Sequence, residues 1–320
     1  MTAARDIEDV IAIARMRWEE RCPQVEIARR LGVSEATVSR ALKRAFDLGL
    51  VEVRIAASAS RQPQLEERLA ERFGLKLAIV VATQGDEAET RQVLGEAMAR
   101  RLDQVIEQGS IIGVSDGETT AAVARAAGRS RAADIEVVSL IGGVGAPEQA
   151  SHPAEVCRTL ARALGAKAWM LPLPAVVDDA ETARRLRAQK SVASVFDLMQ
   201  RLDIALVGVG GTNADAAIVQ HGVIGEADMR AMGARGAAGT ICARFYDRAG
   251  KPLRSSLDQR TIAVTQADLR RARHCIAVAF GEGKRAAIAA ALGGGWINGI
   301  GTDAATALAL LEAAREGGTA

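Results

Sequence analysis

Residues 24–45, QVEIARRLGVSEATVSRALKRA, hold two short helical patterns joined by a glycine, and they decide how the N-terminal part of the chain folds. Pro23 suits the first turn of a helix, where N–H groups have no intrahelical partner. Gly32 supplies the left-handed backbone on which helices commonly end. Ser34 can cap the next helix by accepting from its free N–H groups. The spacing therefore predicts a helix-turn-helix.

Each of the two helical patterns has one apolar face. The residues expected to face inward are Val25, Ile27, Ala28 and Leu31 in the first helix and Val38, Ala41, Leu42 and Ala45 in the second. Between residues 29 and 44 lie five positive charges and one negative charge, although the whole chain has a net charge of only +2. A local basic patch in a nearly neutral chain suits an element that enters a DNA groove. The residues expected at the DNA are Gln24, Arg29, Ser34, Glu35, Thr37, Ser39, Arg40, Lys43 and Arg44.

Flanking patterns complete a small N-terminal domain. Ile7, Val10, Ile11, Ala14 and Trp18 recur at helical spacing, which predicts an amphipathic helix from residue 6 to about residue 20. Residues 50–55, LVEVRI, alternate apolar and charged side chains as a half-buried strand does. A strand at this place would be the wing of a winged helix-turn-helix. We expect residues 1–56 to form this DNA-binding domain.

Beyond a small, polar stretch at residues 56–63, which reads as a linker, the sequence changes character. Short apolar runs alternate with long helical patterns, as expected for strands covered on both faces by helices. The sequence therefore predicts an α/β fold for residues 57–320, with an open, doubly wound and largely parallel sheet. The expected strands lie within residues 77–82, 110–115, 135–143, 167–174, 203–211, 261–265, 274–281 and 297–303.

Composition excludes several classes of protein. The four cysteines are far apart, and the three histidines do not flank them at metal-ligand spacing, so we expect reduced thiols and no metal site. No apolar run reaches membrane-spanning length. The N-terminus, MTAARDIEDV, lacks the basic and apolar regions of a signal peptide. We expect a cytoplasmic protein without a membrane partner.

Three loops that follow predicted strands carry the candidate chemistry. After SIIGVS comes Asp116-Gly117-Glu118-Thr119-Thr120 at the start of a helix, where backbone N–H groups and hydroxyls suit a phosphate or a sugar hydroxyl. A plain strand–helix turn capped by Thr119 is the alternative. After the strand near residue 281, Lys284 at the start of a helix is well placed for a phosphate, or is simply a solvated lysine.

The third loop, VGVGGT at residues 207–212, invites comparison with a dinucleotide-binding fingerprint. Asn213 occupies the place of the third glycine, and Asp228 alone is weak support for a ribose contact, so no NAD or other cofactor is expected. A glycine-rich strand end beside a ligand crevice is the better interpretation. Because these loops all follow parallel strands, they should meet at one edge of the sheet, where open α/β sheets bind ligands.

The order and spacing of these blocks resemble the SorC-type transcriptional regulators, which are also grouped with a branch of the DeoR sugar regulators. The similarity covers essentially the whole chain, from QVEIARRLGVSEATVSRALKRA through IGVSDGETTAAVA, LGAKAWMLPLPAVV and DIALVGVGG to AVAFGEGKRAAIAAALGGGWINGIGTD. The resemblance implies a sugar-binding effector domain with a phosphosugar-isomerase-like fold. It also implies a homo-tetramer, a dimer of dimers, that binds operator DNA and responds to a sugar, a sugar alcohol or a sugar phosphate.

The resemblance also implies the residues that bind the effector. They are Ser115, Asp116, Gly117, Glu118, Thr119, Thr120 and Lys284 for the sugar or its phosphate, Gly208, Gly210 and Gly281 along the crevice, and Asp247 near its rim. Asp116 and Glu118 depart from the family pattern. Two carboxylates repel a phosphate and accept from hydroxyls, so an unphosphorylated sugar or sugar alcohol is favoured. Glu35 also departs from the pattern and can accept from cytosine N4.

An enzyme is the rival reading, namely a sugar-phosphate isomerase or deaminase with a DNA-binding appendage. The fold would suit it, since fold does not fix function. Such an enzyme needs a general base and an acid beside the reacting carbon. Asp116, Glu118 and Glu282 are candidates, but no histidine lies in a glycine-rich loop and no nucleophile–base pair is found. We therefore expect no catalytic residues.

Overall fold

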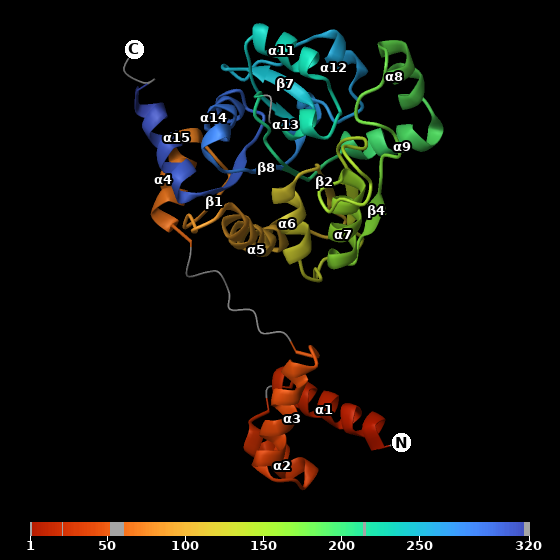
Figure 1. Ribbon diagram of the computed structural model, residues 1–320, viewed down its shortest axis with the longest axis vertical. Coiled ribbons are helices and arrows are strands. Elements are labelled where there is room, and N and C mark those ends of the chain that lie inside the picture. The colour runs from red at the N-terminus through yellow and green to blue at the C-terminus, as the bar shows by residue number, and fades with distance from the viewer. Residues whose placement is uncertain (1, 21, 52–60, 214–215, 317–320) are drawn as a thin grey trace. The chain divides into compact units, whose positions relative to one another are not determined.

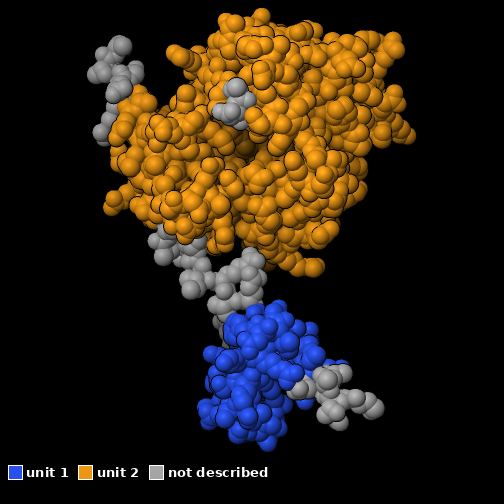
Figure 2. Space-filling view, viewed as in Figure 1, with its two compact units in different colours: residues 1–56 blue, residues 57–320 orange. Residues whose placement is uncertain are grey.

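The computed structural model describes residues 2–20, 22–51, 61–213 and 216–316. The chain divides into two compact units, Met1–Ala56 and Ala57–Ala320, which are coloured separately in Figure 2. We call them the DNA-binding unit and the effector unit, after the roles that the sequence predicts for them. The expected wing strand, apart from its first two residues, and most of the expected linker lie outside the described residues.

The DNA-binding unit holds three described helices, α1 (Thr2–Trp18), α2 (Gln24–Leu31) and α3 (Glu35–Asp47) (Figure 1). Gly32 ends α2 with a left-handed backbone, at φ 66°. The Ser34 hydroxyl accepts from the Thr37 N–H over 3.2 Å and caps α3. Val38, Leu42 and Ala45 are buried on the inner face of α3. The helix-turn-helix prediction is confirmed.

The buried faces of α1 and α2 are narrower than expected. In α1 the core residues are Val10, Ile13 and Ala14, whereas Ile7 and Trp18 are 40% and 37% exposed. In α2 only Ile27 and Ala28 are buried, and Val25 and Leu31 face outward. A two-turn helix that packs along one line buries only the residues on that line, so spacing alone assigned too many residues to the core.

The effector unit is built around a seven-stranded sheet in the order β1-β9-β8-β5-β2-β3-β4, in which every pair is parallel. This arrangement confirms the predicted α/β class. Its strands are β1 (Leu77–Val81), β2 (Ile111–Val114), β3 (Glu136–Ser139), β4 (Lys167–Trp169), β5 (Ile204–Val207), β8 (His274–Val278) and β9 (Gly299–Asp303).

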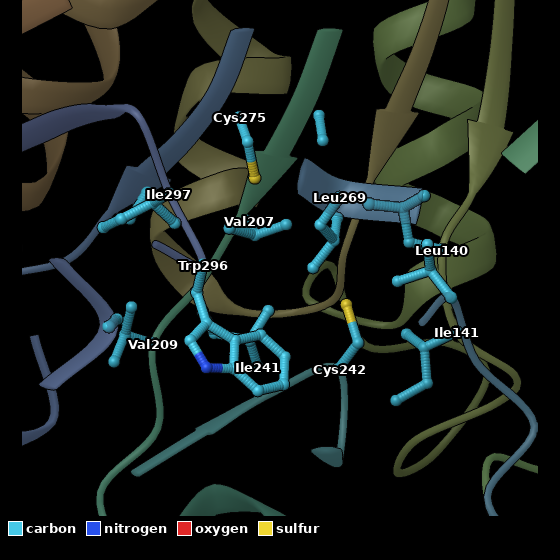
Figure 3. Close-up of a cluster of buried hydrophobic side chains, with 14 of the residues drawn as sticks. Leu140, Ile141, Val207, Val209, Ile241, Cys242, Leu269, Cys275, Trp296 and Ile297 are labelled. Atoms are coloured by element: carbon cyan, nitrogen blue, oxygen red, sulfur yellow. The ribbon is translucent and has the colours of Figure 1, made fainter. Parts of the chain in front are cut away.

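Helices cover both faces of the sheet (Figure 1). One face packs against α5 (Glu87–Val105), α6 (Glu118–Ala126) and α7 (Pro153–Leu164). The other packs against α4 (Pro63–Phe73), α9 (Lys190–Met199), α13 (Gln266–Arg271), α14 (Arg285–Gly293) and α15 (Ala304–Glu316). The remaining short helices are α8 (Ala180–Arg187), α10 (Ala217–Gln220), α11 (Glu226–Ala234), α12 (Ser256–Arg260) and the 3₁₀ turn η2 (Glu282–Lys284). Figure 3 shows part of the hydrophobic core on this second face, with Val207 of β5, Cys275 of β8 and Trp296 labelled.

A two-stranded antiparallel hairpin, β6 (Ala237–Ile241) with β7 (Arg244–Asp247), was not expected from the sequence. Conversely, residues 261–265 do not form a strand of the sheet as predicted. They make only isolated bridges, Thr261 with Val176 and Ala263 with Ile141. The buried Arg244 guanidinium instead donates to the Thr261, Ala263 and Val264 carbonyl oxygens and pairs with Asp258. An arginine satisfies the backbone that a neighbouring strand would otherwise pair with.

Candidate functional site

A cavity of about 460 Å³ lies where the strands β8, β5, β2 and β3 reach their carboxyl ends. After β2 the chain crosses to β3, and after β5 it goes on to β8 on the opposite side. The crevice between β2 and β5 is therefore a topological switch point, where open α/β sheets bind ligands. The lining residues are Glu87, Arg91, Ser115, Asp116, Gly117, Glu118, Thr119, Ile141, Val144, Gly208, Val209, Gly210, Gly211, Asn213, Ala216, Ala217, Ile218, Thr240, Cys242, Ala243, Phe280, Gly281, Glu282, Gly283 and Lys284.

The hydroxyl groups of the loop after β2 are occupied by the protein itself. Ser115 Oγ donates to the Asp116 carbonyl oxygen and accepts from the Gly208 N–H, both over 2.9 Å, which ties the ends of β2 and β5 together. Thr119 Oγ1 donates to the Val278 carbonyl oxygen of β8 over 2.6 Å. Thr120 Oγ1 donates back to the loop carbonyls of Asp116 and Gly117. These side chains shape the cavity, and they hold three strand ends in fixed positions.

Asp116 presents the most perturbed carboxyl group of the cavity. Burial among protein atoms raises its pKa to about 6, while a backbone hydrogen bond and the charge of His221 act in the opposite direction. Its surface remains partly accessible, since the cavity reaches it. The carboxyl can therefore accept a hydrogen bond when ionised and donate one when protonated. Both forms suit the hydroxyl groups of a polyhydroxy ligand.

The cationic side of the cavity is formed by Lys284 and Arg91. Burial lowers the pKa of Lys284, and the nearby charge of Arg91 lowers it further, while Glu87 raises it. Arg91 is already paired with Glu87 over 3.2 Å, one turn away on α5. Among the described lining residues the carboxylates of Glu87, Asp116, Glu118 and Glu282 outnumber these two cations.

The hairpin β6–β7 forms the wall opposite the sheet edge. Thr240 pairs with Gly210 through two backbone hydrogen bonds of 2.9 and 3.0 Å, which places the hairpin beside the end of β5. Thr240 is 6% exposed, and its hydroxyl has no hydrogen-bond partner among the described residues. The turn residues Cys242 and Ala243 both have positive φ, 49° and 57°, as a two-residue hairpin turn requires. Because a buried hydroxyl without a partner is costly, the Thr240 hydroxyl is a candidate contact for a ligand in this cavity.

The structure brings most of the residues proposed from sequence to this one cavity. Ser115, Asp116, Gly117, Glu118, Thr119, Gly208, Gly210, Gly281 and Lys284 all line it. Thr120 is fully buried behind the loop and does not line it. Asp247 is also absent from the lining, because its Oδ1 accepts from the Ala249 and Lys251 N–H groups and closes the turn after β7. Asp247 is thus not among the lining residues, and its place near the rim of the effector site stays a prediction.

Sequence reasoning missed the contributions of α5 and of the hairpin. Glu87 and Arg91 sit on an ordinary charged helix surface, which carries no signal of a cavity. Thr240, Cys242 and Ala243 were missed because the hairpin itself was not predicted. The Cys-Ala pair lacks the Asn-Gly or Asp-Gly residues that usually mark such a turn.

The outward face of α3 is a candidate DNA interface. Glu35, Ser39, Arg40, Lys43 and Arg44 are exposed, as are Gln24, Arg29 and Ser34, and Thr37 is half-buried. Arg40 Nε donates to the Ala36 carbonyl oxygen over 3.2 Å, and its Nη2 lies 3.4 Å from Thr37 Oγ1. The Thr37 hydroxyl also contacts Ser34 Oγ over 2.9 Å. The N-terminal turns of α3 thus present a continuous polar surface.

The described part of the chain lacks a membrane-spanning helix and a metal site. None of its helices combines the length and apolar character needed to cross a membrane. Nor do its histidine, cysteine and carboxylate side chains gather into a group that could hold a metal ion.

Comparison with known proteins gives the same division of the chain. Residues 57–312 match a family model described as "Putative sugar-binding domain", and residues 12–47 match the model of region 4 of sigma-70. The sorbitol operon regulator of Klebsiella pneumoniae is 32% identical over 98% of this chain and 100% of its own length. The erythritol catabolism regulatory protein EryD of Brucella abortus is 32% identical over 96% of this chain and 98% of its own.

Solved structures agree with these matches. The crystal structure of the full-length sorbitol operon regulator from Klebsiella pneumoniae superposes with a TM-score of 0.79 at 31% identity, and the match covers 96% of this chain and 99% of that one. A probable sor operon regulator from Shigella flexneri gives a TM-score of 0.73 at 30% identity over 78% of this chain and 98% of its own.

Proposed function

This chain belongs to the SorC family of sugar-binding transcriptional regulators, and we propose from this premise that it controls a carbohydrate or sugar-alcohol catabolic operon. It is a DNA-binding regulator whose activity depends on a sugar-type effector. The relatives are named as transcriptional regulators and not as enzymes, so no catalytic role is assigned. A regulator of this kind works where the operator DNA is, which in the bacterial relatives is the cytoplasm.

On the DNA side, α3 enters the major groove with its N-terminal turns toward the bases. Glu35, Thr37 and Arg40 read base edges, with Glu35 accepting from cytosine N4. Arg29, Lys43 and Arg44 bind phosphates and contribute affinity that weakens with salt but does not select sequence. The exposure of Glu35, Arg40, Lys43 and Arg44 on α3, and of Arg29 on α2, supports the proposal.

On the effector side, the cavity binds an unphosphorylated sugar or sugar alcohol. The observation that carries this proposal is the lining itself, which holds the Asp116 carboxyl and Thr240, a residue whose buried hydroxyl has no hydrogen-bond partner among the described residues. Carboxylates and hydroxyls recognise the hydroxyl groups of a polyol. The excess of carboxylates over cations would repel a phosphate. A phosphorylated sugar is the second candidate, because Lys284 and Arg91 could pair with its phosphate group.

A thermal-shift panel tests the effector class. The compounds are sorbitol, erythritol and deoxyribose, each with its phosphate ester. An effector well above its dissociation constant stabilises the folded protein by several kcal/mol, since about 2.7 kcal/mol is gained at 100 times that constant. We expect a neutral compound to raise the melting temperature. Stabilisation by phosphate esters alone would overturn the polyol assignment and favour the second candidate.

We also propose that the protein works as a homo-tetramer, a dimer of dimers, as its family resemblance implies. Two copies are the minimum for a palindromic operator, because each half-site takes one recognition helix. Light scattering after size exclusion should then give four times the chain mass of 33.6 kDa. A particle of one chain mass at working concentration would contradict the proposal.

A further inference from the structure

The chain enters the effector unit at the outer edge of the sheet. Arg61 forms an antiparallel bridge with Val81, and the Gln62 N–H donates to the Val80 carbonyl oxygen over 2.8 Å. Strand β1 stands first in the sheet order, with β9 as its neighbour on the other side. Arg61 and Gln62 therefore occupy its open edge, and they lead directly into α4. Figure 1 shows α4 near β1. The first described residues after the DNA-binding unit are thus attached here to the sheet.

A buried carboxylate fixes this attachment. Glu66, on the first turns of α4, has a side chain only 10% exposed. Its Oε1 accepts from Arg61 Nε and from the Val80 N–H, both over 2.9 Å, and its Oε2 accepts from Arg61 Nη2. The fork of an arginine matches a carboxylate at two points, which a lysine cannot do. We call Arg61, Glu66 and the Val80 N–H the Arg61 clamp.

The clamped strand leads directly to the effector cavity. Beyond Val81 the chain passes through a short loop into α5, whose first turns carry the lining residues Glu87 and Arg91. Hydrogen bonds hold this loop. Thr83 Oγ1 donates to Asp303 Oδ2 over 2.8 Å, and the Gln84 N–H donates to Thr90 Oγ1 over 3.0 Å. A displacement at the start of α5 is therefore carried into β1 rather than absorbed by the loop.

We propose that Arg61 and Glu66 are positioning residues that couple occupancy of the cavity to the DNA-binding unit, an inference that rests on the proposed function. The covalent path from Arg91 to the clamp runs through one helix turn, one tied loop and one strand. With the clamp closed, the chain leaves the effector unit from a fixed point on β1. With the clamp open, the segment before α4 gains length, which lowers the effective concentration of a DNA-binding unit at its half-site.

Operator binding by the full chain tests this coupling. The duplex is one selected by the protein from a random library, and the probes are sorbitol and sorbitol 6-phosphate. The measured quantity is the ratio of operator affinities with and without a saturating probe, which for allosteric regulators is commonly about 5- to 150-fold. In Arg61→Ala we expect the ratio to fall to within about twofold of unity, with the probe's thermal shift unchanged. Arg61→Lys should give an intermediate ratio.

The matched control is Arg184→Ala, which removes an exposed Arg–Glu pair of 2.6 Å on α8, away from both the clamp and the cavity lining. It should keep the wild-type ratio. A wild-type ratio in Arg61→Ala, with both proteins folded and binding the probe, would overturn the proposal. A loss of the ratio in Arg184→Ala as well would overturn it too, because the effect would then not belong to the clamp.

Amide hydrogen exchange tests the clamp independently of the effector assignment. If neither probe changes operator binding by the wild type, the effector assignment fails, and the clamp is judged by exchange in the unliganded full chain. The Gln62 and Val80 amides should exchange slowly in the wild type and faster in Arg61→Ala, while amides in the middle of α5 are unchanged. Equal exchange at Gln62 and Val80 in the two proteins would rule out the clamp.

Discussion

At the scale of single residues, Asp116 couples the stability of the effector unit to pH. Its pKa of about 6 lies above the ordinary aspartate value of 3.8, because burial disfavours the charged form. A carboxyl whose pKa is raised in the folded state contributes stability that is complete below the unfolded value and is lost as the pH rises through the folded value. This contribution to stability is therefore lost between about pH 4 and about pH 6.

The first prediction concerns Asp116→Asn. The free energy of unfolding of the wild type should fall between pH 4 and pH 6, by at most about 3 kcal/mol from this group, since water reaches the cavity. The asparagine variant should lose that component and be the more stable protein at pH 7. Denaturant unfolding at both pH values measures it. Glu118→Gln, an exposed carboxyl in the same loop, is the control and should keep the wild-type pH dependence.

The second prediction concerns Thr240, a cavity-lining residue whose buried hydroxyl has no partner among the described residues. Thr240→Val keeps the shape and removes the hydroxyl, so the unliganded protein should be as stable as the wild type or more so. Effector affinity should fall by about 1–3 kcal/mol, if the hydroxyl contacts the ligand. Titration calorimetry with the stabilising panel compound measures it.

Thr302→Val is a close control for Thr240→Val. Its hydroxyl is likewise buried and without a partner among the described residues, but Thr302 lies on β9 and outside the cavity lining. It should leave effector affinity unchanged. Equal affinity in Thr240→Val and the wild type would remove Thr240 from the site.

At the scale of elements, α3 carries the DNA-binding proposal. Arg40→Ala should reduce the preference for operator over random DNA by about 1–3 kcal/mol, which is the discrimination that a base contact by arginine contributes. Lys43→Ala is the matched variant on the same helix. It should weaken binding to both DNAs equally and lower the slope of log affinity against log salt concentration by about one. Gel shifts at two salt concentrations measure both effects. An operator preference in Arg40→Ala equal to that of the wild type would show that the groove assignment is wrong.

Close packing against α14 and the residues that follow it holds the hairpin β6–β7 in place. Gly250 has φ of +72°, and a Cβ there would come within 2.3 Å of the Ala290 carbonyl oxygen in α14. Trp296 Nε1 donates to the Gly250 carbonyl oxygen over 2.7 Å, and Tyr246 Oη donates to that of Ala287. The hairpin can therefore present Thr240 to the cavity only while this contact is intact.

Gly250→Ala should destabilise the protein by about 2–4 kcal/mol, as the sum of a left-handed backbone and an overpacked contact. It should also weaken effector binding, because the hairpin wall shifts. Gly222→Ala is the control, since Gly222 has a similar φ of +65° but no atom within 4 Å of a Cβ. It should cost only about 1–2 kcal/mol, the penalty of the backbone alone. Equal losses in thermal unfolding would show that the packing at Gly250 contributes nothing.

At the scale of the whole molecule, periodicity and strand-end loops were enough to predict the helix-turn-helix, the parallel sheet and most of the cavity. Parallel strands put their carboxyl ends on one edge, so Asp116, Gly208 and Lys284 had to meet once the strands were identified. The hairpin was not predictable, because the Cys242-Ala243 turn lacks the usual residues. Arg91 was not predictable as a lining residue either, because the sequence pattern of α5 is the same whether a charged side chain faces a cavity or solvent.

The core of the effector unit was predicted more accurately from the sequence than the core of the DNA-binding unit. In the effector unit, strands buried on both faces gave nearly continuous apolar runs, and seven of the eight expected strands lie in the sheet. The exception, residues 261–265, is apolar because it is buried. Arg244 donates to three of its carbonyl oxygens, and the Ile262 and Val264 N–H groups donate to the Ala175 and Leu140 carbonyl oxygens. In the small DNA-binding unit, spacing placed Val25 and Leu31 in a core too small to hold them.

The most direct test of the central claim is a titration of operator binding by the full chain with the panel compound that stabilises it most. If occupancy of the cavity controls the DNA-binding unit, the compound should change operator affinity by about 5- to 150-fold. Thr240→Val should need a higher concentration of the compound for the same change, with its effector-free operator affinity equal to that of the wild type. A compound that demonstrably binds the wild type and leaves its operator affinity unchanged at saturation would contradict the account.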